Sequence, residues 1–124
     1  MYIKINNTLY PAVINGRVAD QEWDGRASKA ITLEMSYYEA TELFTNGLSW
    51  KIVDIKKVPV YNEQGLYVYD EEGNQVMEEK VTEYDNSEFN VAGDIIDHRN
   101  GMLTVKMGKL TDLEEAYEII LGGI

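Results

Sequence analysis

The side chains able to carry out chemistry are few in kind. The chain has one histidine, His98, and no cysteine, which removes thiol nucleophiles, thiolate metal sites and disulfides. A nucleophilic triad needs a base that is held by a third group. His98 lies beside Asn100-Gly101, a strong hairpin signal, and an exposed residue at a hairpin tip is the simpler explanation for it. We therefore predict no nucleophilic centre.

Carboxylates remain as candidate acids, bases or metal ligands. Asp70-Glu71-Glu72 and Asp94-Ile95-Ile96-Asp97 are the most evident groups, but neither has the alternating oxygen ligands of a calcium loop. Paired carboxylates also hydrolyse glycosides, but 22 acidic residues produce such pairs by chance. The segment Leu121-Gly122-Gly123-Ile124 follows an expected helix and does not open one, so it is not a phosphate loop. We predict no catalytic residue, no cofactor and no metal.

The charge of the chain limits its partners. Eleven basic and 22 acidic residues give a net charge of −11, with the acids spread over both halves. Phosphate backbones would be repelled, so direct nucleic-acid binding is not expected. The acidic surface either confers solubility or mimics nucleic acid in a partner's basic groove. Because no segment resembles a membrane span or a signal peptide, we expect no membrane contact and a cytoplasmic protein.

Length and composition predict a single domain over residues 1–124. The chain is 44% hydrophobic and 27% charged, as in globular proteins, and its nine tyrosines and two tryptophans favour strands. We expect an α+β fold: a mostly antiparallel β-sheet with hairpins, one short helix near residues 37–45 and a C-terminal helix near residues 112–121.

The N-terminal third carries strand and turn signals. Ile3 and Ile5 alternate with polar residues, which predicts a half-buried strand, and Asn6-Asn7 predicts a tight hairpin after it. Pro11 is expected to end the returning strand or confine it to a sheet edge. Asn15-Gly16 predicts a further turn.

A strand followed by a helix is predicted next. Residues 30–35 alternate cleanly, and Ser36 and Glu39 have the spacing of a capping box. The helix is expected to end at Asn46-Gly47. Its apolar stripe would consist of Tyr37, Ala40, Leu43 and Phe44.

Polar extended segments occupy the middle of the chain. Residues 48–58 are expected to be extended, and two further pieces near residues 66–69 and 75–83 are punctuated by glycines. Burying the glutamates of the last piece unpaired would be costly. We therefore predict a long hairpin over residues 66–83 that projects from the body.

The C-terminal third predicts a hairpin at Asn100-Gly101 and then a helix. Thr111 and Glu114 form a second capping-box pattern, and Gly122-Gly123 is expected to stop the helix. The apolar stripe of this helix comprises Leu113, Ala116, Tyr117, Ile120 and Leu121. Since residues 31–35 and 103–107 have similar sequences and each precedes a helix, we expect both helices to pack on one sheet.

Contact with another protein is expected at two places. Trp23 lies in a polar loop over residues 20–28, and a large ring in such a loop is typical of binding surfaces. The alternative is that Trp23 folds back over one end of the sheet as a lid. The candidate contact residues are Trp23, Asp24, Arg26, Tyr67, Tyr69, Glu78 and Glu79.

Several segments together resemble a group of small uncharacterised proteins encoded by phages and prophages of Gram-positive bacteria. They are residues 18–29, with Glu22-Trp23-Asp24-Gly25-Arg26, and residues 43–50, 83–89 and 105–109. The resemblance implies a phage accessory protein whose partners are other phage proteins, found in the host cytoplasm or in the virion. It carries no catalytic residues across.

Three functions follow from these observations. The leading expectation is a non-enzymatic structural or accessory phage protein that acts through protein contacts and can pair with itself through strand edges. The alternative is an early-expressed acidic inhibitor that blocks a host nucleic-acid-binding or defence protein by charge mimicry. A small hydrolase is the third, and it requires a concave site with perturbed carboxylates.

Overall fold

Seven antiparallel strands form one sheet, with two helices, in the computed structural model, which describes residues 1–122. The strands are β1 (Tyr2–Ile5), β2 (Thr8–Asp20), β3 (Arg26–Glu34), β4 (Lys51–Pro59), β5 (Met77–Asp85), β6 (Val91–Asp97) and β7 (Met102–Gly108). The helices are α1 (Tyr37–Leu43) and α2 (Asp112–Gly122). The strand order is β5-β4-β1-β2-β3-β7-β6, which confirms the predicted α+β class.

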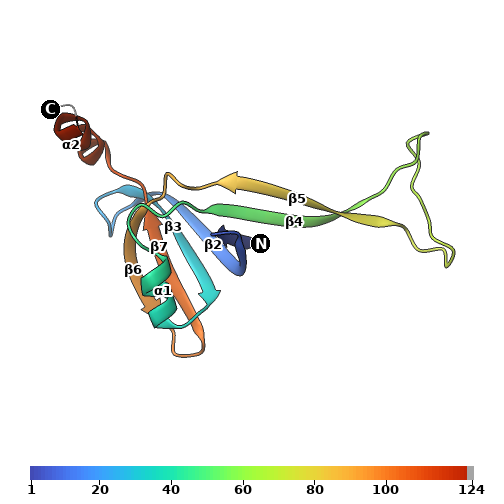
Figure 1. Cartoon of the computed structure of the whole chain (residues 1–124), viewed down its shortest axis with the longest axis horizontal. Coiled ribbons are helices and arrows are strands. Elements are labelled where there is room, and N and C mark those ends of the chain that lie inside the picture. The colour runs from blue at the N-terminus through green and yellow to red at the C-terminus, as the bar shows by residue number, and fades with distance from the viewer. Residues whose placement is uncertain (123–124) are drawn as a thin grey trace.

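The hydrophobic core lies between α1 and one face of the sheet (Figure 1). The middle of β3 and β7 supplies four buried residues that pair across the strands: Ile31, Leu33, Leu103 and Val105. Ala40 of α1, Phe44 just after it and Trp50 just before β4 join the same cluster. We call this cluster, together with α1 and the strands that contribute to it, the body of the protein.

The short helix starts as predicted. The Glu39 amide donates a hydrogen bond of 3.2 Å to the Ser36 hydroxyl, which caps α1. Ala40 and Phe44 are buried, whereas Tyr37 is 54% exposed, so the apolar stripe that packs is narrower than expected.

Strand β2 is longer than its sequence pattern predicts. It pairs with β1 as far as Pro11 and with β3 from Ala12 onward, so the expected end at Pro11 is wrong. The Ala12 amide donates to the Met1 carbonyl, so the proline nitrogen faces the other side, where pairing with β3 has not begun and no donor is needed. The predicted turn at Asn15-Gly16 is also wrong, because both residues stay in register with β3.

An arm made of β4 and β5 projects from the body (Figure 1). Its register pairs Lys51 with Asp85 at the root and Pro59 with Met77 at the outer end. The projecting hairpin is confirmed. Of its predicted pairing within residues 66–83, Tyr69 does bridge Gln75, but all nine residues of β5 pair with β4 instead.

The arm ends in two small loops built from a tandem eight-residue repeat. Val, Tyr, Glu and Gly recur at the same places in residues 60–67 and 68–75. In the first loop the side chain of Asn62 accepts from the amides of Gln64 and Leu66, and in the second Asp70 accepts likewise from Glu72 and Asn74. Both loops turn at a glycine with positive φ, 77° at Gly65 and 85° at Gly73.

A ring of backbone hydrogen bonds joins these loops to the arm. The Val68 amide donates to Val60, the Val76 amide to Val68, and the Val60 amide to Val76, at 3.1, 2.8 and 3.0 Å. The three valines are half-buried at the junction. We call residues 60–76 the arm tip. Its shape is set by its own backbone and by its two asparagine- or aspartate-capped turns.

The C-terminal hairpin is confirmed, with β6 and β7 joined around Asn100-Gly101. Helix α2 then leads away from the sheet (Figure 1). The expectation that both helices pack on the sheet is therefore wrong for α2, whose apolar side chains are exposed and whose Glu114 is held by Arg26 of β3. Of the predicted stop at Gly122-Gly123, residue 123 lies outside the described residues.

Candidate interaction surfaces

Trp23 lies over one end of the sheet, on the face opposite the core. A tight turn places it there, because the amides of Trp23 and Gly25 both donate to the Asp20 carbonyl, at 3.0 and 2.8 Å. The half-buried ring rests on bare backbone at Gly93 and Gly108, where added Cβ atoms would approach it to 2.6 and 2.8 Å. This arrangement is the alternative in which Trp23 folds back over one end of the sheet as a lid.

Asp20, at the base of the Trp23 turn, is fully buried at 0% exposure. Its carboxylate accepts from the Lys106 ammonium at 2.8 Å, the Ser28 hydroxyl at 3.1 Å and the Glu22 amide at 3.1 Å. The hydrogen bond from Lys106 is the largest effect on the pKa of Asp20, which lies below its ordinary value although burial opposes this. This buried ion pair is a structural support for the turn.

Arg26 ties α2 to the body. Its side chain is 5% exposed, and its guanidinium lies 2.9 Å from the Glu114 carboxylate and donates to the Lys109 carbonyl at 3.1 Å. Glu114 in turn accepts from the Thr111 amide at 2.9 Å, while the Glu114 amide donates to the Thr111 hydroxyl at 3.2 Å. The predicted capping box of α2 is confirmed. The hydrogen bond from the Thr111 amide, followed by that from Arg26, lowers the pKa of Glu114.

The packing of the Trp23 ring on the backbone of Gly93 can be tested directly. We expect Gly93→Ala to lower the free energy of unfolding by about 1–3 kcal/mol, because the new methyl group would overlap the ring. Combined with Trp23→Ala it should cost at least about 1 kcal/mol less than the sum of the two single changes. Urea unfolding measures both. Gly16→Ala is the control, since its Cβ meets Lys29 at an ordinary 3.5 Å; additive effects would contradict the arrangement.

The arm tip presents exposed aromatic and apolar side chains. Tyr61, Leu66, Tyr67 and Tyr69 are between 49% and 64% exposed. The rings of Tyr61 and Tyr67 stack with their centroids 5.2 Å apart. Four acidic residues belong to the same segment of the chain: Glu63, Asp70, Glu71 and Glu72.

The candidate contact residues therefore fall into two separate places. Tyr67 and Tyr69 are exposed at the arm tip, and Glu78 and Glu79 are exposed on β5 beside it. Asp24 is exposed in the turn between β2 and β3, and this turn lies at the opposite end of the β4–β5 arm from the arm tip (Figure 1). Trp23 and Arg26 are engaged in internal packing, so the exposed candidates gather on the arm.

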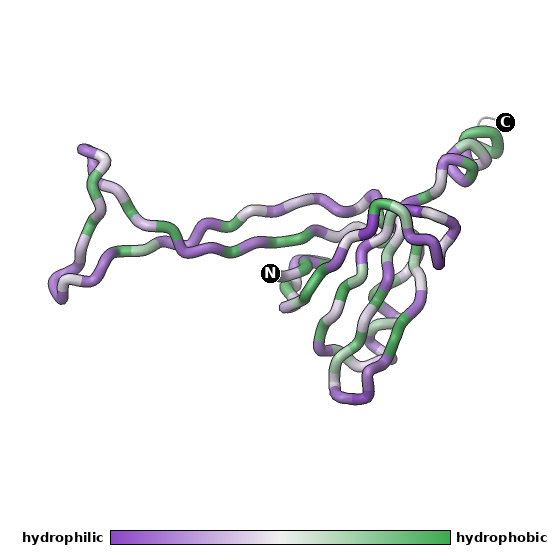
Figure 2. Tube along the Cα trace, turned by 180° about the vertical axis from the view of Figure 1, so that it is seen from behind, coloured by the Kyte–Doolittle hydropathy of each residue, from purple (hydrophilic) through white to green (hydrophobic). Residues whose placement is uncertain are grey.

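Helix α2 is a further exposed surface, which the sequence predicted only as a packed helix. Its apolar side chains are between 56% and 81% exposed: Leu113, Tyr117, Ile119, Ile120 and Leu121. Figure 2 shows this helix as a partly hydrophobic segment at the end of the chain. Its acidic residues are Asp112, Glu114, Glu115 and Glu118, and it contains no lysine or arginine.

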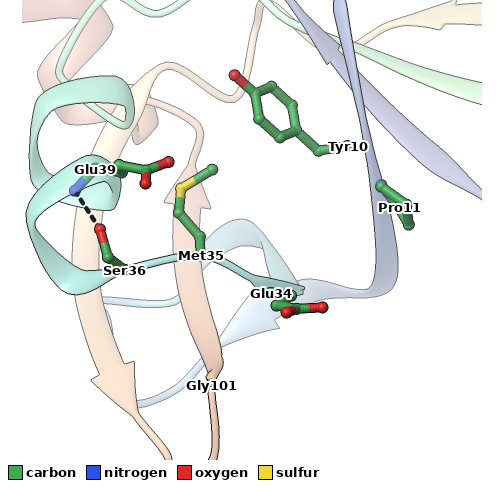
Figure 3. A pocket seen from close by; sticks show the side chains of 7 residues that line it. All are labelled: Tyr10, Pro11, Glu34, Met35, Ser36, Glu39 and Gly101. Atoms are coloured by element: carbon green, nitrogen blue, oxygen red, sulfur yellow. Dashed lines mark hydrogen bonds between the residues drawn. The ribbon is translucent and has the colours of Figure 1, made fainter.

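A hollow of about 570 Å³ lies between α1 and the start of β2 (Figure 3). Its lining residues are Tyr10, Pro11, Glu34, Met35, Ser36, Glu39 and Gly101. The Ser36 hydroxyl there caps α1 through the Glu39 amide, so it serves the helix. Within residues 1–122, no three histidine, cysteine or acidic side chains are grouped as a metal site, and no helix has the length and apolarity to cross a bilayer.

Comparisons with known proteins identify no relative. No protein-family model, curated protein or solved structure matches the chain.

Proposed function

We propose that this protein is a non-enzymatic assembly component of a phage or prophage particle, and that it binds another particle protein through the arm tip. One observation carries the proposal: stacked and exposed aromatic side chains stand at the end of an arm that the body does not cover. Tyrosines of this kind are common anchors of protein interfaces. The phage context rests on the resemblance of the sequence.

The build of the arm supports a binding role. Eight of the nine residues of β5 are exposed, so the arm has little core of its own. A two-stranded hairpin is marginally stable in water, and a partner that covers it adds stability that the body does not provide. The internally bonded loops of the arm tip are ordered before binding, which lowers the entropy cost of association.

We expect removal of the arm tip to abolish incorporation without unfolding the body. Residues 61–75 are replaced by Asn-Gly, which can join Val60 to Val76 because their backbones are already hydrogen-bonded at 3.0 Å. Mass spectrometry of purified particles measures incorporation, and circular dichroism checks the fold. A matched control, Glu63→Gln with Glu71→Gln, keeps the aromatic side chains.

Two results would contradict the proposal. One is absence of the unaltered protein from particles together with expression only early in infection. The other is normal incorporation of the chain without its arm tip. Tight binding to a basic host protein that weakens steeply with salt would favour the acidic inhibitor instead.

A further inference from the structure

The two loops of the arm tip are copies of one structural element. Residues 60–67 and 68–75 carry Val, Tyr, Glu and Gly at the same places, with an asparagine or aspartate after the tyrosine. Their backbone pairing also corresponds, because Tyr61 bridges Tyr67 in the first loop and Tyr69 bridges Gln75 in the second. The loops therefore present equivalent positions on equivalent backbones.

Most of the repeated residues are explained by the backbone that they build. The valines form the hydrogen-bonded ring, the asparagine and aspartate cap the turns, and the glycines supply the positive φ. Glu63 and Glu71 are exposed turn residues, and such surface charge favours solubility. Tyr61 and Tyr69 are 56% and 60% exposed and take no part in the ring or the caps. Their recurrence indicates a shared role at the surface.

The ring of valines directs both tyrosines to one face of the arm tip. Its hydrogen bonds run in one cyclic direction, since Val68 and Val76 each donate to the preceding valine and Val60 donates to Val76. Three antiparallel ladders leave the ring, two into the loops and one into the arm (Figure 1). Side chains alternate along extended chain, so the residues on either side of each valine share the face opposite to the valines. We call these residues the ring face: Pro59, Tyr61, Tyr67, Tyr69, Gln75 and Met77.

The ring face carries no charge. All six of its residues are neutral, and the next pair along the arm, Lys57 opposite Glu79, combines one charge of each sign. A partner on this face is therefore held by aromatic and apolar contact. A second copy of this chain is a poor occupant, because two copies with a net charge of −11 each repel one another.

From these observations we infer that the two loops bind two identical sites on a homo-oligomeric partner. This inference rests on the proposed role in particle assembly and adds the kind of partner, a protein that presents the same apolar site from two of its subunits. Because both tyrosines lie on the ring face, one partner surface can contact both. Once the first loop is bound, the second contact forms at a high effective concentration, so a duplicated loop strengthens binding to a partner whose site is itself repeated.

Exchange of the two loops gives the sharpest test. The variant carries the sequence of residues 68–75 at positions 60–67 and the reverse, so length, composition and ring valines are unchanged. It is produced together with the unaltered chain in the cells that assemble the particles, and mass spectrometry compares the ratio of the two chains in purified particles and in the cell extract. We expect the ratios to agree within about twofold, because either loop fits either site. Limited proteolysis checks that the exchanged arm tip is folded.

Single changes to the repeated tyrosines test the same point without moving a loop. In the same competition, Tyr61→Ser and Tyr69→Ser are each expected to be depleted from particles at least about tenfold, as for loss of an aromatic anchor. Tyr38→Ser is the matched control and should enter particles as the unaltered chain does, since Tyr38 is 73% exposed on α1, outside the arm.

Three results would overturn the inference. Exclusion of the folded exchanged chain from particles would show that each loop has a different site, and depletion of only one tyrosine variant would show that one loop binds alone. Oligomers of the isolated chain that both tyrosine variants dissociate would show that the occupant is a second copy. The proposed function stands in the first two cases, whereas absence of the unaltered chain from particles would remove that function itself.

Discussion

Replacing Trp50 with alanine is expected to lower the free energy of unfolding by about 3–5 kcal/mol, the range for loss of a buried aromatic side chain. Trp50 is 1% exposed in the core beside the root of the arm. Its indole donates to the Phe89 carbonyl at 2.9 Å, and its own carbonyl accepts from the Asn86 amide at 2.9 Å. The ring therefore holds the segment after β5 against the chain entering β4.

Urea unfolding of Trp50→Ala and Trp50→Phe separates packing from hydrogen bonding. Phenylalanine keeps much of the apolar ring but leaves the Phe89 carbonyl without its donor, so we expect a loss of about 1–3 kcal/mol. Tyr84→Ser on the exposed arm is the control and should change stability little, because that side chain is 54% exposed. A loss below about 1 kcal/mol for Trp50→Ala would contradict the placement of this ring in the core.

Replacing Asp20 with asparagine is expected to destabilise the protein strongly at neutral pH and weakly in acid. The change leaves the Lys106 ammonium, whose side chain is 16% exposed, without its closest carboxylate. The pKa of Asp20 is lowered below its ordinary value of 3.8, chiefly by the Lys106 hydrogen bond. Ionised Asp20 thus stabilises the fold at pH values above 3.8, and this contribution disappears as the pH falls through the lower folded value.

Thermal unfolding of both proteins over a range of pH values measures this difference. The gap between the melting temperatures should be constant above about pH 5 and close below pH 3.8. Glu22→Gln is the control, since this carboxylate is 80% exposed and 3.7 Å from the same lysine, and exposed pairs contribute little. A gap that does not change with pH would show that the charge of Asp20 is not what stabilises the turn.

Much of the fold could be predicted from local sequence patterns. Ser36 with Glu39 and Thr111 with Glu114 mark both helix starts, because capping depends on a few neighbouring residues. Asn100-Gly101 marks the last hairpin for the same reason. Elements whose conformation depends on pairing with a distant strand are harder to predict. Asn15-Gly16 has the residue types of a turn, but its pairing with β3 keeps it extended.

The exposure of the candidate contact residues could be predicted only in part. Tyr67 and Tyr69 are exposed, as contact residues must be. Local sequence cannot show that the Arg26 guanidinium pairs with the Glu114 carboxylate, because Glu114 lies 88 positions further along the chain. The exposure of α2 could not be predicted either. An amphipathic helix has the same spacing of apolar residues whether or not its apolar side packs against the body. The tandem repeat over residues 60–75 can be read from the sequence and indicates the two similar loops of the arm tip.

The ring of hydrogen-bonded valines makes each eight-residue loop of the arm tip a separate structural unit. Each repeat leaves this ring at one valine and returns to it at the next, from Val60 to Val68 and from Val68 to Val76. Exchange of one loop for another of equal length would leave Pro59 opposite Met77 and the body untouched. Such an exchange would change the side chains that the tip exposes while conserving everything that the body needs in order to fold.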